Sequence, residues 1–309
     1  MSFTTTVKQE LNHVARERGC CRTAELAALF RASGSFHLLP GERYGLEAAF
    51  GLSATARTGL QLVRYFNLPV EVRVREERRL GQRKRYELYM EGGSRLAQFL
   101  NEIGVLSDRL ALLDTIPQRI IKQRCCQEAF LRGAFLASGS VSEPGSAAHL
   151  EIYSGSAVFL GTLQETASSL GLKLSLVDRR RNQAVYAKSL GAIRDFLVAT
   201  GAHESALNFE QRAILSSVRE GANRRANCDQ ANAARCSRAA ARQIRAINRL
   251  RQTGVWKDLT PNLMEAAELR LRHPSSTIVE LGGLADPPLS KSAVNHRLRR
   301  LVELAGSPA

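Results

Sequence analysis

Long apolar runs are missing from this 309-residue chain, and cysteine, proline and aromatic residues are scarce. No stretch approaches the roughly 18 to 20 apolar residues that a membrane-spanning helix requires, which argues against membrane insertion. The first twenty residues also lack the apolar core of a secretory signal. The six cysteines, which include two adjacent pairs, do not resemble a disulfide framework. We therefore expect a cytoplasmic protein.

Acidic residues are few relative to basic ones. The chain has 44 Lys and Arg against 29 Asp and Glu, so its formal net charge is +15. Such an excess favours a polyanionic partner, above all nucleic acid. The excess is largest in residues 219–309, which hold 16 basic and 8 acidic groups. Nothing in the composition indicates a small-molecule substrate or a cofactor, and we expect neither.

An internal repeat divides the chain. The segment CCRTAELAALFRASGSF at 20–36 matches CCQEAFLRGAFLASGSV at 125–141, with nine of seventeen positions identical. The offset of 105 residues suits one small duplicated domain. We therefore predict two repeats, residues 1–105 and 106–218, and a separate C-terminal domain, residues 219–309.

Hydrophobic spacing predicts the same element order, αββαββα, in each repeat. The first repeat is expected to contain a helix at 23–33, strands at 36–39 and 44–52, a helix at 54–66 and a hairpin over 70–90. The second is expected to contain helices at 127–138 and 157–169, a strand at 149–153, a hairpin over 172–188 and a helix ending at Thr200. The fold class is α+β, with an all-α domain at the end.

Basic residues crowd the polar faces of both hairpins. The first hairpin holds seven within thirteen residues, which favours contacts with a DNA backbone: Arg73, Arg75, Arg78, Arg79, Arg83, Lys84 and Arg85. The second holds Lys173, Arg179, Arg180, Arg181 and Lys188. A solvated arginine-rich face is the alternative, and for the second hairpin the two interpretations carry equal weight.

The repeated segments LAALFRASG (26–34) and LRGAFLASG (131–139) resemble the signature helix of the LAGLIDADG homing endonucleases. The resemblance implies two αββαββα halves that pack through these helices. Small residues would let the two backbones approach closely, and they are Ala28, Ala32, Gly133 and Ala137.

The same resemblance argues against catalysis. In that family an acidic residue just before the last glycine of each helix holds a divalent metal, and here these positions are Ser33 and Ser138. A neutral hydroxyl binds Mg²⁺ weakly. Glu143 is the nearest downstream acid in the second repeat, and the first repeat has no counterpart. We predict that the protein is not an enzyme.

The paired cysteines, Cys20-Cys21 and Cys125-Cys126, allow two interpretations. Four thiolates at related helix starts could form a zinc site. Adjacent residues on a helix, however, point about 100° apart, and no two-residue spacer is present. We interpret the cysteines as buried packing residues and expect no metal.

In the C-terminal third, the helical spacing of apolar residues predicts a basic helix through 233–250, a helix at 261–272 and a helix-turn-helix motif over 276–309. Thr277 and Glu280 fit a capping box, and Ser290 begins the last helix. Its buried stripe is expected to be Val294, Leu298, Leu301 and Ala305. The residues expected to contact DNA are Ser290, Lys291, Ser292, Asn295, His296, Arg297, Arg299 and Arg300. Among them Lys291, Asn295, His296 and Arg299 are expected at base edges, Arg297 and Arg300 at phosphates, and Ser290 with the amino end of the helix at a further phosphate. An ordinary amphipathic surface helix is the alternative.

Along nearly its full length the chain resembles the WhiA family, the sporulation and cell-division transcription regulators of Gram-positive bacteria. SKSAVNHRLR at 290–299 is the most specific piece. The resemblance implies sequence-specific binding to promoter DNA in the nucleoid, with an inactive endonuclease-like part that binds a protein partner, the chain itself or DNA. A working or vestigial endonuclease, or a protein-interaction scaffold with non-specific DNA affinity, are the alternatives.

Overall fold

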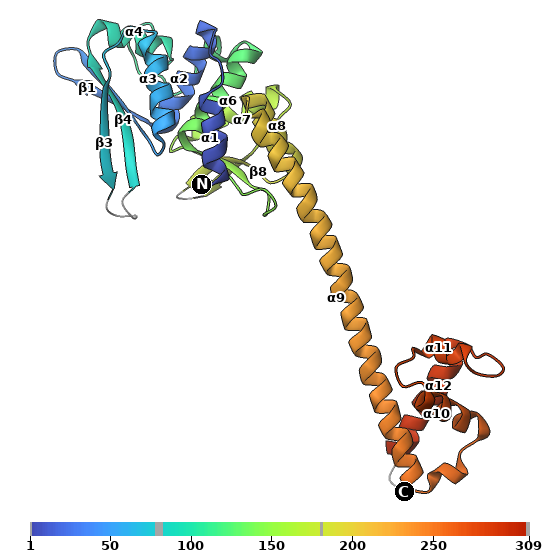
Figure 1. Ribbon diagram of the computed structural model, residues 1–309. Coiled ribbons are helices and arrows are strands. Elements are labelled where there is room, and N and C mark those ends of the chain that lie inside the picture. The colour runs from blue at the N-terminus through green and yellow to red at the C-terminus, as the bar shows by residue number, and fades with distance from the viewer. Residues whose placement is uncertain (1, 78–82, 180–181, 307–309) are drawn as a thin grey trace. The chain divides into compact units, whose positions relative to one another are not determined.

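The structure is a computed structural model that describes residues 2–77, 83–179 and 182–306. The chain divides into two compact units, Met1–Ser217 and Val218–Ala309, and each is described by itself (Figure 1). The first half of the first unit contains α1 (Phe3–Asn12), α2 (Gly19–Ser33), β1 (Gly34–Leu39), β2 (Arg43–Phe50), α3 (Ser53–Arg64), β3 (Glu71–Glu77), β4 (Arg83–Gly92) and α4 (Ser94–Glu102).

The second half of this unit repeats the order. It contains α5 (Gln118–Ile121), α6 (Arg124–Ser138), β5 (Gly139–Val141), β6 (Leu150–Tyr153), α7 (Ala157–Ser169), β7 (Ser175–Arg179), β8 (Asn182–Ala187), α8 (Leu190–Thr200) and the start of α9 (His203–Gln252). The predicted αββαββα order is present in both halves, and the mixed fold class is confirmed. Helix α1 lies ahead of the αββαββα order in the first repeat, and the sequence analysis did not predict it.

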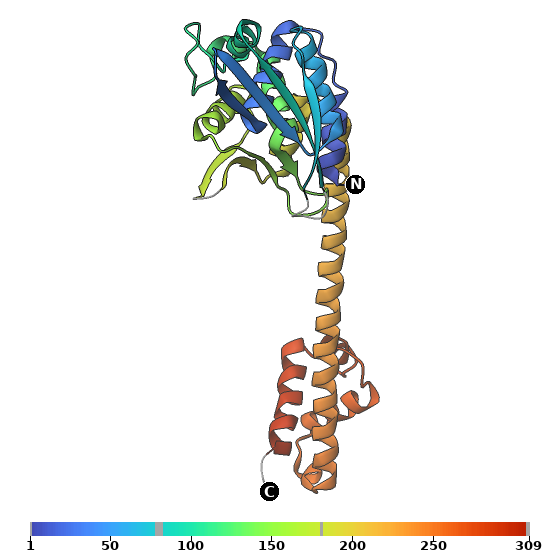
Figure 2. The same cartoon turned by 90° about the vertical axis from the view of Figure 1, so that its left-hand side faces the viewer.

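Each half builds one four-stranded antiparallel sheet, in the orders β1-β2-β4-β3 and β5-β6-β8-β7. In the first sheet Phe36 lies opposite Leu46, and Leu46 lies opposite Met90. Because side chains alternate along a strand, this row packs against the helices and the intervening row forms a polar face. Figure 2 looks onto the strands of this first sheet.

Helices α2 and α6 lie side by side in the core of the first unit (Figure 1). Ala28 is fully buried, and a Cβ added at Gly133 would lie 2.3 Å from the backbone oxygen of Glu25. Only glycine permits this approach. The predicted packing role of Ala28 and Gly133 is confirmed, whereas Ala32 and Ala137 are only half-buried.

The second unit is all-helical, with the remainder of α9, a 3₁₀ turn (Val255–Asp258), α10 (Pro261–Arg272), α11 (Ile278–Gly283) and α12 (Lys291–Gly306). Its core joins Ile247 and Leu250 of α9 to Ala267 of α10 and to Leu298 and Leu301 of α12. The end of α9 is therefore part of this unit.

Helix α9 is longer than the sequence prediction. The helix expected to end at Thr200 is α8, as predicted, whereas the helix expected over 233–250 is part of α9, which is continuous from His203 to Gln252. This segment contains no proline and is rich in alanine and arginine, which are strong helix formers. The change in composition near Glu220 marks the loss of a buried face, because residues 222–238 are exposed.

Candidate nucleic-acid interface

Two capped helices, α11 and α12, form the end of the chain. Thr277 accepts a hydrogen bond from the backbone nitrogen of Glu280 (3.3 Å), and the Glu280 carboxylate accepts one from the backbone nitrogen of Thr277 (2.7 Å). Ser290 Oγ accepts from the backbone nitrogen of Ala293 at 3.2 Å. Both predicted N-terminal caps are confirmed. The hydroxyl of Ser290 therefore fixes where α12 begins.

The segment between these helices packs tightly against α11. The backbone nitrogen of Leu289 donates to the carbonyl of Gly282 at 2.8 Å, and a Cβ at Gly282 would lie 2.4 Å from the oxygen of Leu289. Glycine is required here because of this close approach. The long turn between α11 and α12 is therefore held in place by its own backbone.

Helix α12 is buried on one side and exposed on the other. Val294, Leu298, Leu301 and Ala305 are at most 8% exposed, so the predicted stripe is confirmed. The side chains that face outward are Lys291, Ser292, Asn295, His296, Arg299 and Arg300. Amide, imidazole and guanidinium groups of this kind can read base edges in the major groove of DNA.

Arg297 faces a different partner from the one expected. Its Nη1 lies 2.8 Å from Glu265 Oε2 on α10, and its side chain is only 19% exposed. Arg299 and Arg300 remain exposed and share Glu303, at 3.2 and 3.5 Å. The structure thus assigns Arg297 to the contact between α10 and α12, which disfavours the expected phosphate contact.

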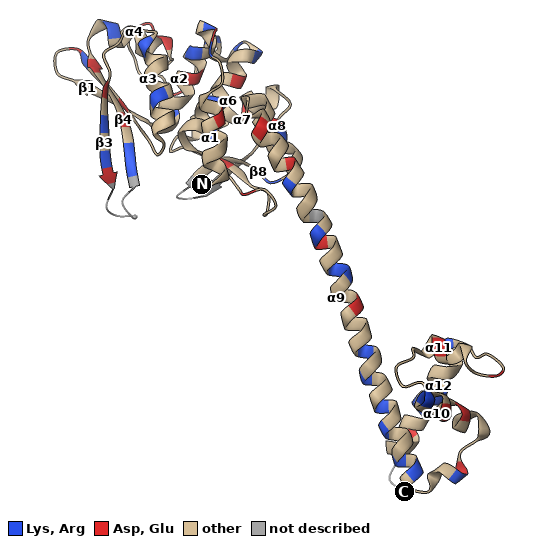
Figure 3. Ribbon diagram, in the orientation of Figure 1, with Lys and Arg blue, Asp and Glu red and all other residues tan. Residues whose placement is uncertain are grey.

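The sequence predicted a basic helix over 233–250, but the individual arginines of its basic face were not named as candidate binding residues. Arg235, Arg238, Arg242, Arg245 and Arg249 recur at intervals of three and four, so they share one face of the helix. The blue positions that recur along α9 in Figure 3 are arginines. This spacing in the alanine-rich segment was the signal that could have identified the row, which we call the α9 arginine stripe.

The α9 arginine stripe adjoins the exposed side of α12. A groove of about 520 Å³ is lined by Arg242 and Gln243 of α9 and by Asn295, Arg299, Val302 and Glu303 of α12. Arg242 of the stripe therefore meets Asn295 and Arg299, two of the predicted DNA-contacting residues, at one surface of the second unit.

Buried Arg270 was also missed by sequence reasoning. Its Nη1 donates to the backbone oxygen of Ser276 at 2.7 Å, and the residue is 2% exposed. Burial lowers the pKa of this guanidinium. Arg270 thereby ties the end of α10 to the residues that precede α11.

In the first unit, two of the basic residues on the polar face of β3 and β4, Arg73 and Arg75, are paired with glutamates. Arg73 contacts Glu71 (2.7 Å) and stacks over the Tyr89 ring at 4.0 Å, and Arg75 contacts Glu87 (2.9 Å). The hydrogen bond with Glu71 raises the pKa of Arg73. The positive potential of this face is therefore lower than the sequence count predicted.

The other basic residues predicted on the two hairpins lie on either face of their sheets or outside the described residues. Lys84 lies opposite Glu76 in the register, on the other face from Arg75 and Arg85. Lys173 and Lys188 are exposed, and Lys188 Nζ lies 5.2 Å from the Tyr186 ring. Outside the described residues lie Arg78, Arg79, Arg180 and Arg181, together with the side chains of Arg83 and Arg179.

Ser33 and Ser138, which stand where the LAGLIDADG endonucleases have acidic residues, lie at the C-terminal ends of α2 and α6. Ser33 Oγ donates to the backbone oxygen of Leu29 at 2.8 Å, and Ser138 Oγ donates to that of Tyr153 at 2.6 Å. Glu143 accepts from the backbone nitrogen of Phe3 at 2.8 Å and so caps α1. Each group is used within the protein, which argues against a role for any of them in holding a catalytic metal.

The opposite ends of α2 and α6 bring four cysteines together. The Sγ atoms of Cys20, Cys21, Cys125 and Cys126 all lie within 4.8 Å of one another. Our interpretation as buried packing residues is wrong for Cys20, which is exposed, and holds for Cys126. The directional argument failed because it considered each helix alone, whereas the two pairs face each other across the helix pair.

The environment of the thiols is uneven. Desolvation, together with hydrogen bonding to Cys125, raises the pKa of Cys21 to about 12. Desolvation also acts to raise the pKa of Cys125, but hydrogen bonds from Cys21 and Arg18 outweigh it and lower that pKa overall. Arg18 Nη1 lies 3.7 Å from Cys125 Sγ.

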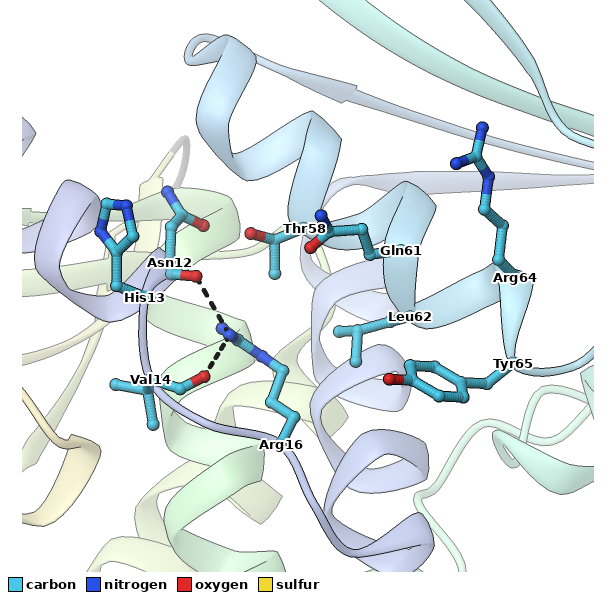
Figure 4. Close-up of a pocket in the computed structure, with 9 residues that line it drawn as sticks. All are labelled: Asn12, His13, Val14, Arg16, Thr58, Gln61, Leu62, Arg64 and Tyr65. Carbon is cyan, nitrogen blue, oxygen red and sulfur yellow. Dashed lines mark hydrogen bonds between the residues drawn. The ribbon is translucent and has the colours of Figure 1, made fainter.

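A pocket of about 600 Å³ lies between α1 and α3 (Figure 4). Arg16 lines it but donates to the backbone oxygens of Asn12 (3.2 Å) and Val14 (2.6 Å). Its remaining donors contact Leu11 and the carboxylate of Glu25. The charge of Arg16 therefore serves the fold, and we assign no ligand to this pocket.

Within the described parts of the chain, no helix has both the length and the apolar character needed to cross a membrane.

Fold and interface together define a class of protein with two LAGLIDADG-like domains and a C-terminal helix-turn-helix. Family models match in this order: the WhiA N-terminal LAGLIDADG-like domain at residues 19–106, the WhiA LAGLIDADG-like domain at 127–219 and the WhiA C-terminal HTH domain at 222–305. The chain belongs to the WhiA family.

Relatives match over nearly their full length. The Probable cell division protein WhiA of Alkaliphilus metalliredigens is 34% identical over 309 residues, covering 99% of this chain and 98% of that protein. The protein of the same name from Heliobacterium modesticaldum is 35% identical over 306 residues, covering 99% and 96%. The crystal structure of full-length DUF199/WhiA from Thermatoga maritima is similar in fold, with a TM-score of 0.58, 24% identity and coverage of 99% and 98%.

Proposed function

We propose that the protein is a sequence-specific regulator that binds double-stranded promoter DNA in the nucleoid and acts in cell division and sporulation. The observation that carries the proposal is the surface of the second unit, where the exposed side of α12 adjoins the α9 arginine stripe. Family membership and the name of the relatives, Probable cell division protein WhiA, support the same role.

The contacts divide by chemistry. Asn295, His296 and Arg299 of α12, with Lys291, read base edges, because an amide pairs with adenine and a guanidinium with guanine. Arg300 and the α9 arginine stripe bind phosphates, which fixes the register of the protein on the duplex. Ser290 and the amino end of α12 are suited to hold a further phosphate.

A single helix-turn-helix buries little DNA, so a second protomer or the first unit would complete a specific complex. We infer that the first unit acts as a scaffold that recruits a protein partner or a second copy. Strong DNA binding by the polar face of β3 and β4 in the first unit is less favoured, because Arg73 and Arg75 on that face are paired with glutamates.

We further propose that the endonuclease-like unit does not cleave DNA. Supporting this are the serines at both former acidic positions and the internal hydrogen bonds that their hydroxyls make. The test is incubation of the full-length protein with supercoiled plasmid and Mg²⁺ or Mn²⁺. Plasmid that stays supercoiled is the expected result. Nicking that co-purifies with the protein and disappears in a Ser33→Ala/Ser138→Ala variant would show that cleavage is retained.

DNA binding is tested separately by gel-shift competition with genomic fragments. Asn295→Ala and Arg299→Ala are expected to weaken binding to preferred fragments, and Arg124→Ala, on an exposed surface of α6, is the matched control. Unchanged affinity in both α12 variants would remove the recognition role of that helix.

A further inference from the structure

The cysteine cluster lies where the N-terminal ends of α2 and α6 meet. Cys20 and Cys21 are in the first turn of α2, and Cys125 and Cys126 are in the first turn of α6. Each helix supplies two adjacent sulfurs, and the side-by-side packing of α2 and α6 brings the two pairs to one point. All four Sγ atoms lie within 4.8 Å of one another.

We infer that these four cysteines bind one zinc ion. A tetrahedral site with Zn–S bonds of about 2.3 Å separates its sulfurs by about 3.8 Å, so the thiols need to move by no more than about 1 Å. A polynuclear iron–sulfur cluster would place its own iron and sulfide atoms between the thiolates and hold them farther apart. The compact arrangement therefore favours a single soft cation.

The surroundings suit a thiolate site. In the metal-free protein the thiols of Cys20 and Cys125 donate to Gln123 Oε1 at 3.7 and 3.6 Å, and both bonds are given up when the thiols lose their protons to bind the ion. Arg18, 3.7 Å from Cys125 Sγ, offsets part of the negative charge of a four-thiolate zinc centre. The amino ends of two helices favour negative charge as well. Because Cys20 is exposed, an ion can reach the cluster from solvent.

This position differs from the metal position of an endonuclease. Ser33 and Ser138 are at the far ends of the same helices, about 20 Å away along a helix that rises 1.5 Å per residue. An ion held by the cysteines would therefore serve the structure, by tying the two halves of the first unit together across α2 and α6. Binding forms four Zn–S bonds and releases the thiol protons to solvent, with no change of oxidation state.

Metal content of the full-length protein tests the inference. Protein purified in reducing buffer, loaded with Zn²⁺ and dialysed against metal-free buffer is analysed by inductively coupled plasma mass spectrometry. We expect one zinc ion per chain. We also expect Co²⁺ to give the intense visible bands of tetrahedral thiolate coordination. A Cys20→Ser/Cys125→Ser variant should lose both signals.

The matched control is Cys228→Ser/Cys236→Ser, which removes the two exposed cysteines of α9 and should keep the full zinc content. Cys20→Ser alone changes an exposed residue, so it should stay folded by circular dichroism while binding zinc more weakly. The inference is overturned if the reduced wild type retains no zinc above the buffer level. It is also overturned if folded Cys20→Ser binds zinc as tightly as the wild type, or if the cobalt spectrum lacks thiolate bands.

Discussion

Arg132 of α6 lies 2.9 Å from Glu25 of α2, joining the two halves of the first unit by an ion pair in the core. Glu25 is fully buried and Arg132 is 8% exposed on its side chain. Arg16 completes the network at 2.7 Å from the other oxygen of the same carboxylate. One carboxylate of α2 therefore pairs both with Arg132 of α6 and with Arg16, which lies between α1 and α2.

Replacing Glu25 should destabilise the protein strongly. Glu25→Gln leaves two buried guanidiniums without a counter-charge, and breaking a buried pair in this way costs about 3–5 kcal/mol. Denaturant unfolding of the first unit measures the loss. Glu128→Gln, which breaks an exposed pair with Arg124, is the control and should cost less than about 1 kcal/mol. Equal effects of the two variants would contradict the buried-network account.

Arg297 and Arg299 should have separable roles although they are two residues apart. Arg297→Ala removes the 2.8 Å contact with Glu265 and should lower the thermal stability of the second unit. Arg299→Ala should leave stability unchanged and weaken binding to the preferred DNA sequence by about 1–3 kcal/mol. Thermal melting and gel-shift measurements on both variants distinguish the stabilising role from the DNA-binding role. An Arg297→Ala variant that keeps its thermal stability but no longer binds DNA would reverse our assignment.

The α9 arginine stripe should govern the salt dependence of binding. For duplex DNA, the slope of log K against log salt becomes shallower by about 0.9 for each phosphate that the protein no longer neutralises. Arg238→Ala and Arg245→Ala should therefore flatten the slope and weaken specific and non-specific DNA binding alike. Fluorescence anisotropy over a series of salt concentrations measures this, and Arg95→Ala on exposed α4 surface is the control. A slope unchanged in both stripe variants would exclude the stripe from the DNA interface.

Because of Lys8, the free energy of unfolding of the first unit should rise at alkaline pH. Burial of its ammonium above the Phe135 ring lowers the pKa of Lys8 from 10.5 to about 8. Between these values the unfolded chain binds the proton that the folded protein has released, so the free energy of unfolding increases with pH. Below about pH 8 the folded protein carries the charge and this gain is absent. We expect the free energy of unfolding of Lys8→Met to rise less with pH than that of the wild type between pH 8 and 10.5. Parallel curves of unfolding free energy against pH for the two proteins would refute the assignment.

Local sequence patterns predicted most of the fold. The repeat predicted both αββαββα halves, and the spacing of Val294, Leu298, Leu301 and Ala305 predicted the buried side of α12, because periodicity within one helix reports burial directly. The Thr277 capping box and the Ser290 cap were also readable, since each involves residues three apart.

What the sequence could not show depends on contacts between elements. Glu25 and Arg132 are 107 positions apart, and the four cysteines converge only because α2 and α6 lie side by side. Likewise the ion pair that separates the role of Arg297 from that of Arg299 is made with Glu265 on another helix. The count of basic residues overestimated the positive potential of the first hairpin, because Arg73 and Arg75 are paired with glutamates and a count of one residue type does not reveal such pairs.

The central claim is that α12 reads DNA sequence. Its most direct test selects preferred sites from random DNA with the wild-type protein, then measures the ratio of specific to non-specific affinity at fixed salt. In an Asn295→Ala/Arg299→Ala variant we predict that this ratio collapses toward one while non-specific binding persists through the α9 arginine stripe. A variant that keeps the wild-type ratio for the selected site would contradict the account.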